Sequence, residues 1–142
     1  IGLHPASSGF IMIRSYRLSS GSTTGGAGSS GATAVTNSEI VGSVLAIGVI
    51  YNGSAPASTD VTVATEAAVG SPSITLVGLT NANSDTWVYP AAALTTSAAA
   101  AVTYDGTNEI YVGQPIAGEV KLTVAQANDA DSVDICLVVD EG

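Results

Sequence analysis

Short segments in which β-branched and polar residues alternate recur along this 142-residue chain. The clearest examples are residues 60–65 (DVTVAT), 119–125 (EVKLTVA) and 133–140 (VDICLVVD). Because successive side chains of a strand point to opposite faces, this period of two predicts strands with one buried face. The 26 Val and Ile residues, against 8 Leu, favour strands as well. The side chains expected to face inward are Val61, Val63, Ile74, Leu76, Val120, Leu122, Val124, Ile135, Leu137 and Val139.

Turn residues separate these segments at short intervals, and this spacing predicts an all-β fold of about eight strands. We expect an antiparallel β-sandwich that is jelly-roll-like. The apolar run at 40–51 (IVGSVLAIGVIY) indicates a strand buried on both faces. Asn52-Gly53 directly after it favours a tight hairpin, and the alanine-rich residues 91–101 suit either a short helical turn or an extended loop. The expected strands are residues 9–18, 40–51, 60–65, 73–79, 85–89, 109–112, 119–125 and 133–140.

The length of the chain fits one domain. Residues 1–38 are expected to hold a strand and a Gly/Ser-rich arm or long loop, and residues 39–142 the β-sandwich. Residues 19–31 contain only Ser, Gly, Thr and Ala, which cannot form a core and cost entropy to order. We predict that this extended N-terminal segment is a contact arm or a mobile surface loop. Because the chain begins at Ile1 and not at Met, we expect that an initiator or a leader was removed or that residues are missing.

The charge balance excludes some classes of partner. The chain has 12 acidic residues and three cations, Arg14, Arg17 and Lys121, so its net charge is −9. A phosphate backbone needs several cations per footprint, so we expect no nucleic-acid partner. The longest apolar run, residues 40–51, is shorter than the roughly twenty residues of a membrane-spanning helix, so no membrane partner is expected either. A charged fraction of only 11% suits a protein that is packed against others.

Residues that carry chemistry are scarce. His4 and Cys136 are the only histidine and cysteine, which leaves little for a zinc site or a catalytic triad. Residues 26–31 (GAGSSG) match a dinucleotide-binding pattern but lack the strand and helix that it requires. The acidic stretch at 128–134 suits a solvated turn or, less well, a calcium site, because its spacing is not that of an EF-hand. We therefore expect no enzyme and no catalytic, cofactor or metal site.

Four residues stand out as interaction candidates. Trp87 and Tyr89 alternate with Val88 and so share one face of a strand. They suit a platform for stacking sugar, an anchor at a protein interface, or the core and rim of the sandwich. Arg14 and Arg17 are two of the three cations of an acidic chain, and they suit either an interface with carboxylates or solvated strand ends.

Four strings of the sequence resemble small head proteins of tailed bacteriophages. The similarity runs over about residues 44–140, and the family consists of capsid decoration or cement proteins. The resemblance implies a structural virion protein on the capsid exterior that binds the lattice of the major capsid protein and stabilises the shell. Capsid symmetry favours homodimers or homotrimers. The strings are Thr59–Val63, Ser84–Pro90, Tyr104–Ile110 and Gly118–Gln126.

A second class of function stays open from the residues themselves. Trp87, Tyr89 and the acidic turns suit a carbohydrate-binding or adhesive extracellular β-sandwich. A fibre-like or pilus-like subunit belongs to the same class, because Gly/Ser-rich termini can donate strands to neighbouring subunits.

Overall fold

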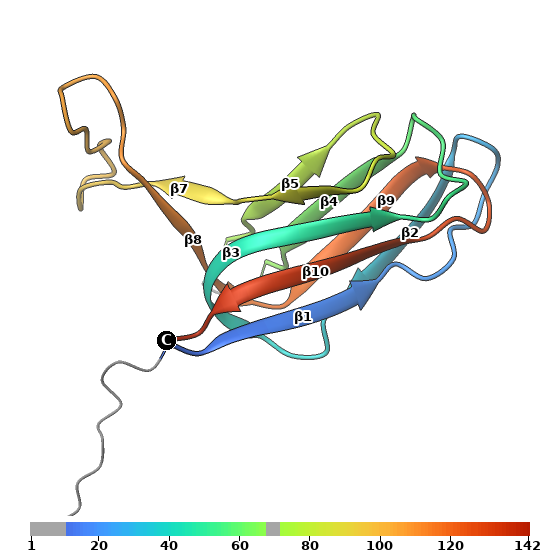
Figure 1. Ribbon diagram of the computed structural model, residues 1–142, viewed down its shortest axis with the longest axis horizontal. Coiled ribbons are helices and arrows are strands. Elements are labelled where there is room, and N and C mark those ends of the chain that lie inside the picture. Colours follow the sequence, from blue (N-terminus) through green and yellow to red (C-terminus); the bar gives the residue numbers. More distant parts are fainter. Residues whose placement is uncertain (1–10, 68–71) are drawn as a thin grey trace, which may run out of the picture.

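The computed structural model describes residues 11–67 and 72–142, and it is an all-β structure (Figure 1). Ten strands form two antiparallel sheets that pack face to face, which confirms the predicted β-sandwich. The two described ranges contain no helix of the length and hydropathy that a membrane crossing requires. His4 and the first two residues of the strand predicted at 9–18 lie outside the described residues.

The strands divide unequally between the two sheets. In the first sheet, the order is β1, β10, β3, β8 and β7, and β6 also pairs with β3. In the second sheet, the order is β2, β9, β4 and β5. The first sheet contains β1 (Ile13–Ser19), β3 (Ile40–Tyr51), β6 (Thr86–Val88), β7 (Ala91–Ala93), β8 (Tyr111–Gly118) and β10 (Val133–Asp140). The second contains β2 (Ser30–Val35), β4 (Asp60–Thr65), β5 (Thr75–Leu79) and β9 (Val120–Ala127).

Most connections cross from one sheet to the other. Six pairs of successive strands lie in opposite sheets: β1 and β2, β2 and β3, β3 and β4, β5 and β6, β8 and β9, and β9 and β10. The hairpin predicted at Asn52-Gly53 is therefore wrong, because this turn leads from β3 to β4 across the sandwich. The jelly-roll topology stays a prediction.

The core lies between the sheets and follows the period of two. Nine of the ten side chains predicted to face inward are buried, and the tenth, Ile74, is partly buried against the core. The prediction that residues 40–51 are buried on both faces is wrong. Val44, Ile47 and Val49 lie in the core, but Leu45 and Ile50 are exposed, because one face of an antiparallel sheet in a sandwich meets solvent.

Two strands were missed by the sequence analysis because they are made of small residues. Strand β2 pairs with β9, with Ala32 opposite Val124 and Ala34 opposite Leu122. The three alanines of β7 pair with the start of β8. Neither segment has the β-branched content that marks a strand, so the neighbouring strand, and not local propensity, sets its conformation.

The Gly/Ser-rich residues 19–31 lie against the turn between β9 and β10. Thr23 is fully buried, and its backbone N–H donates to the carbonyl of Asp131 at 2.8 Å. Its hydroxyl accepts a hydrogen bond from the N–H of Asp131 at 2.9 Å. The N–H of Gly28 donates to the side chain of Asn128 at 3.0 Å. These bonds hold the loop on the sandwich, and Ser30 and Gly31 already belong to β2.

Candidate functional site: an exposed sheet face and a projecting arm

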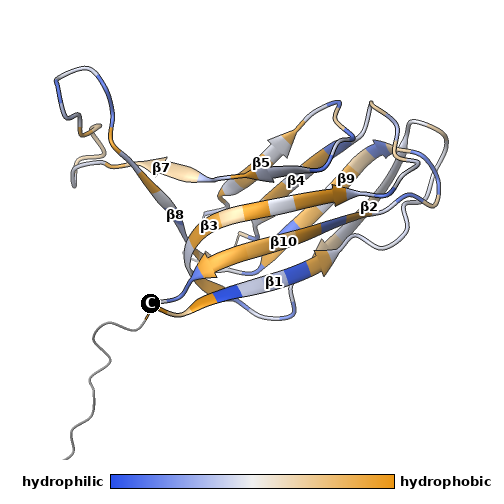
Figure 2. Cartoon of the chain, viewed as in Figure 1, coloured by the Kyte–Doolittle hydropathy of each residue, from blue (hydrophilic) through white to orange (hydrophobic). Residues whose placement is uncertain are grey.

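The solvent-facing side of β1, β10, β3 and β6 carries a row of four residues across the strands, and we call this side the outer face. Arg17 is paired with Cys136, Cys136 with Gly48, and Gly48 with Trp87. At about 4.8 Å per strand, the row spans about 14 Å. Figure 2 shows β10 and β3 mainly in the hydrophobic colour and two hydrophilic bands on β1, the strand beside β10. Two predicted interaction residues, Arg17 and Trp87, thus stand at the two ends of one row.

The indole of Trp87 rests on a glycine. A Cβ atom at Gly48 would lie 3.2 Å from two carbons of the indole ring, so the ring occupies the space that a side chain would fill. An aromatic ring that covers a cross-strand glycine is a known way to shield such a position. The Trp87 side chain is nevertheless 54% exposed, so one side of the ring is free to contact another molecule.

Shallow hollows lie on the outer face on either side of Cys136. One contains Trp87, Ile50 and Thr86, and the other contains Arg17, Ser19 and Asp134. Ile50 and Cys136 line both hollows, so the two are adjacent. The outer face therefore has Ile50 and Cys136 in its middle, Arg17 and Asp134 toward one end, and Trp87 and Asp85 toward the other.

Tyr89 follows β6 directly and is 70% exposed. Val88 between Trp87 and Tyr89 packs against the core. Both aromatic side chains thus point away from the core.

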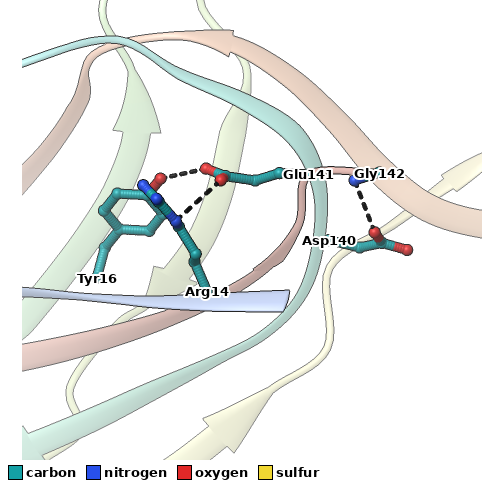
Figure 3. Close-up of polar contacts among 5 residues, drawn as sticks. All are labelled: Arg14, Tyr16, Asp140, Glu141 and Gly142. Carbon is teal, nitrogen blue, oxygen red and sulfur yellow. Dashed lines mark hydrogen bonds and ion pairs between the residues drawn. The ribbon is translucent and has the colours of Figure 1, made fainter. Parts of the chain in front are cut away.

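Arg14 has a different environment from Arg17, although both lie on β1. Figure 3 shows Arg14 beside Tyr16 and Glu141. Its Nε atom lies 3.4 Å from Oε1 of Glu141, and the hydroxyl of Tyr16 donates to the other carboxylate oxygen. Hydrogen bonding to Tyr16, and then the charge of Glu141, raise the pKa of Arg14. This cluster ties the end of the chain to β1, so Arg14 is already engaged within the molecule.

Arg17 is the cation without an internal partner in the described part of the chain. Arg14 pairs with Glu141, and Nζ of Lys121 lies 3.5 Å from Glu66, whereas no described carboxylate lies within 4.0 Å of Arg17. Arg17 is also exposed. Its guanidinium is thus available to an anion outside the chain.

A second unusual surface is the segment 91–112, which projects from the end of the sandwich (Figure 1) and which we call the arm. Strand β7 pairs with the first three residues of β8, whereas Gln114–Gly118 of β8 pair with β3 in the sandwich. No residue of the arm is buried. Large apolar side chains are nevertheless present, including Tyr104 at 71% and Tyr111 at 62% exposed, and also Leu94 and Val112.

The tip of the arm is held by its own polar groups. The carboxylate of Asp105 accepts hydrogen bonds from the N–H groups of Thr107 at 2.9 Å and Asn108 at 2.6 Å. These hydrogen bonds lower the pKa of the Asp105 carboxyl, and the bond from the N–H of Asn108 has the largest effect. The hydroxyl of Tyr111 donates to Glu109 at 3.0 Å, which raises the pKa of Tyr111. The turn predicted at 104–107 is therefore present, but the sequence analysis did not identify the arm that carries it.

The acidic stretch at 128–134 is built around one buried carboxylate. Asp131 is 2% exposed and accepts hydrogen bonds from the Ser54 hydroxyl at 2.5 Å, the Asn128 N–H at 3.0 Å and the Asn52 amide at 3.2 Å. Over residues 11–67 and 72–142, no three His, Cys, Asp or Glu side chains are grouped so that they could hold a metal ion. The carboxylate of Asp131 thus joins two loops of the sandwich.

Comparison with known proteins gives no match to this chain among protein-family models, curated proteins or solved structures.

Proposed function

We propose that the chain is a structural virion protein, a capsid decoration or cement subunit that binds the outside of the major capsid protein lattice and stabilises the shell. The observation that carries the proposal is the pair of unpartnered surfaces. The outer face exposes Leu45, Ile50 and Trp87, and the arm exposes Tyr104 and Tyr111. Contiguous exposed apolar surface on a small protein marks contact with other macromolecules.

The sandwich suits a structural role. Both sheets are antiparallel and share one core of aliphatic side chains, so the sandwich is expected to be rigid. The arm extends beyond this body and offers contact area at a distance from it. A subunit that binds only the assembled shell stabilises it by mass action, in proportion to its affinity and concentration.

The sequence adds two further reasons. The strings at 59–63, 84–90, 104–110 and 118–126 resemble capsid decoration proteins. The charged fraction of 11% leaves large uncharged areas that can meet neighbouring subunits without burying unpaired charges.

The test is a binding and stability experiment with particles that lack this chain. Purified chain is titrated onto such particles, the particles are pelleted, and the ratio of bound chain to major capsid protein is measured. We expect saturation at a fixed ratio and a higher temperature of genome release. Binding that increases in proportion to the added chain, without saturation or a change in stability, would contradict the proposal.

A second candidate function is carbohydrate binding, which the exposure of Trp87 on β6 and of Tyr89 directly after β6 favours. A free indole face such as that of Trp87 can stack on the apolar side of a sugar ring. A glycan array with the wild-type chain, Trp87→Ala and Tyr89→Ala tests this function, with Tyr104→Ala on the arm as the matched control. A binding signal that is lost in Trp87→Ala and in Tyr89→Ala but kept in Tyr104→Ala would support carbohydrate binding. An array on which the wild-type chain gives no signal would exclude it.

A further inference from the structure

We infer that Asn52 is a site of self-modification, at which the backbone nitrogen of Gly53 displaces ammonia from the side-chain amide and water then converts the residue to aspartate or isoaspartate. The hydrogen bonds that Asn52 makes in the folded chain restrain this reaction. The inference goes beyond the proposed function and does not rest on it.

The sequence supplies the reactive pair. Residues 52–53 are the only Asn-Gly dipeptide of the chain. An asparagine followed by glycine reacts faster than other asparagines, because glycine has no side chain to hinder the approach of its nitrogen to the amide carbon. Gly53 is exposed, and its N–H donates no hydrogen bond to residues 11–67 or 72–142, so its nitrogen is free to attack.

The reaction needs only water as a co-reactant. The nitrogen of Gly53 gives its proton to water and forms a bond to Cγ of Asn52, the Cγ–Nδ2 bond breaks, and ammonia leaves with a proton taken from water. Water then opens the resulting cyclic imide at either carbonyl carbon. The products are aspartate, with the original backbone, or isoaspartate, whose backbone runs through Cγ and is longer by a methylene group.

The fold holds the amide of Asn52 at both of its polar atoms. Its Oδ1 accepts a hydrogen bond from the N–H of Ser132 at 3.2 Å, and its Nδ2 donates to the hydroxyl oxygen of Ser54 at 2.8 Å and to Oδ1 of Asp131 at 3.2 Å. The backbone N–H of Asn52 also donates to the carbonyl of Ser132 at 3.1 Å. Because Nδ2 leaves only when its bonds are broken, the reaction requires a local opening of this turn.

The product opposes the contact that it replaces. A carboxylate at position 52 has no N–H to donate to Ser54 and Asp131, and it places an anion against the buried carboxylate of Asp131. Like charges at this separation repel, and more strongly where burial excludes water. Isoaspartate also lengthens the connection from β3 to β4. The modification is therefore expected to weaken the junction of the two loops that Asp131 joins.

The rate of modification tests the chemistry of the site. Peptide mass spectrometry of the full chain measures the conversion of amide to acid at each asparagine. In the chain unfolded by urea, we expect Asn52 to react first, and Gly53→Ala to slow it at least about tenfold, because a methyl group then hinders the nitrogen. A Cβ at Gly53 meets nothing within 4 Å, so Gly53→Ala is expected to fold as the wild type does. In the folded wild type, we expect Asn52 to react at least about tenfold more slowly than in urea.

Removing the buried carboxylate tests the restraint. Asp131→Ala is expected to speed the reaction of Asn52 at least about tenfold in the folded chain, because Nδ2 then loses its charged acceptor. Asp129→Ala is the matched control, since it removes an exposed carboxylate from the same turn. Leu122→Ala, in the core, separates local opening from a general loss of stability. Both controls are expected to react as slowly as the wild type, and circular dichroism verifies that each variant is folded.

The product is tested by the melting temperature of Asn52→Asp. We expect a decrease of at least about 4 °C relative to the wild type, because two carboxylates then face each other. Asn37→Asp makes the same change in charge in an exposed loop and is expected to melt as the wild type does. Equal melting temperatures of Asn52→Asp and Asn37→Asp would contradict the predicted weakening.

The outcomes of the rate measurements decide the inference. Reaction of Asn52 that is fast in urea, slow in the folded wild type and fast again in folded Asp131→Ala supports it. Asn52 that reacts no faster than the other asparagines in urea, or that is unaffected by Gly53→Ala, overturns the assignment of the site. Equal rates in the folded and unfolded wild type, or in Asp131→Ala and Asp129→Ala, overturn the restraint, as does Leu122→Ala that reacts as fast as Asp131→Ala.

Discussion

The carboxylate of Asp131 gives the sharpest test of how the loops hold the sandwich together. Removing it by Asp131→Ala leaves three donors without their acceptor. The hydroxyl of exposed Ser54 and the amide of half-buried Asn52 can turn to water, but the backbone N–H of Asn128 cannot move without disturbing the turn. A buried N–H left without an acceptor costs about 1–3 kcal/mol, and Asn128 is half-buried, so we expect a loss of about 2 kcal/mol in the free energy of unfolding.

The pH dependence of this effect follows from the pKa of Asp131. The hydrogen bond from Ser54 is the largest cause that lowers it, followed by those from Asn128 and Asn52, while burial opposes them. A carboxyl whose native pKa is depressed stabilises the fold above its unfolded pKa of about 3.9 and loses this contribution as the pH falls through the native pKa. The side chain introduced by Asp131→Asn does not titrate. The difference in the free energy of unfolding between the wild type and Asp131→Asn is therefore expected to shrink below about pH 4.

The assay is urea unfolding at a series of pH values from 7 to 3, followed by circular dichroism. At pH 7 we expect Asp131→Ala to lower the unfolding free energy by about 2 kcal/mol and Asp131→Asn by less, since the amide keeps one acceptor oxygen. A change below about 0.5 kcal/mol in Asp131→Ala, or a difference from Asp131→Asn that does not depend on pH, would refute the reasoning.

Three further substitutions test the core and the outer face. Tyr51→Phe is expected to raise the free energy of unfolding by about 1 kcal/mol in thermal melts, because the buried Tyr51 hydroxyl has no hydrogen-bond partner among the described residues, and a lower melting temperature would contradict this. Leu122→Ala, at a fully buried position, is expected to cost about 2–5 kcal/mol in urea unfolding, and a cost below 1 kcal/mol would show that Leu122 is not in the core. Gly48→Ala is expected to displace the indole of Trp87, the single tryptophan, and so to increase its fluorescence quenching by acrylamide. Gly78→Ala, where a Cβ meets nothing within 4 Å, is the control, and equal quenching in both variants would contradict the contact.

The parts of the fold that could be predicted are those in which local pattern and tertiary position agree. Strands β4, β9 and β10 alternate strictly, so their inward residues, such as Val63, Leu122 and Leu137, are apparent from period alone. Strand β3 shows the limit of this reasoning. Its apolar residues lie on both faces, and only the position of the sheet at the surface leaves Ile50 exposed.

The candidate site was less predictable because it depends on long-range pairing. Arg17 and Trp87 could be selected as unusual residues of an acidic chain with few aromatics, but their common row requires the register of three strand pairs. The arm at 91–112 consists of small residues with two tyrosines, and without a buried face it has no hydrophobic period to recognise. Conversely, the Gly/Ser-rich residues 19–31 resembled an arm by composition, whereas buried Thr23 fastens them to the turn after β9.

The most direct test of the proposed function is electron cryomicroscopy of particles isolated from the source of this chain. We expect density for the β-sandwich on the outside of the shell, at the same sites around every local symmetry axis and with the arm in contact with a neighbouring subunit. Particles that contain no such density, while the chain is present and folded in the same preparation, would contradict the assignment as a structural subunit of the capsid.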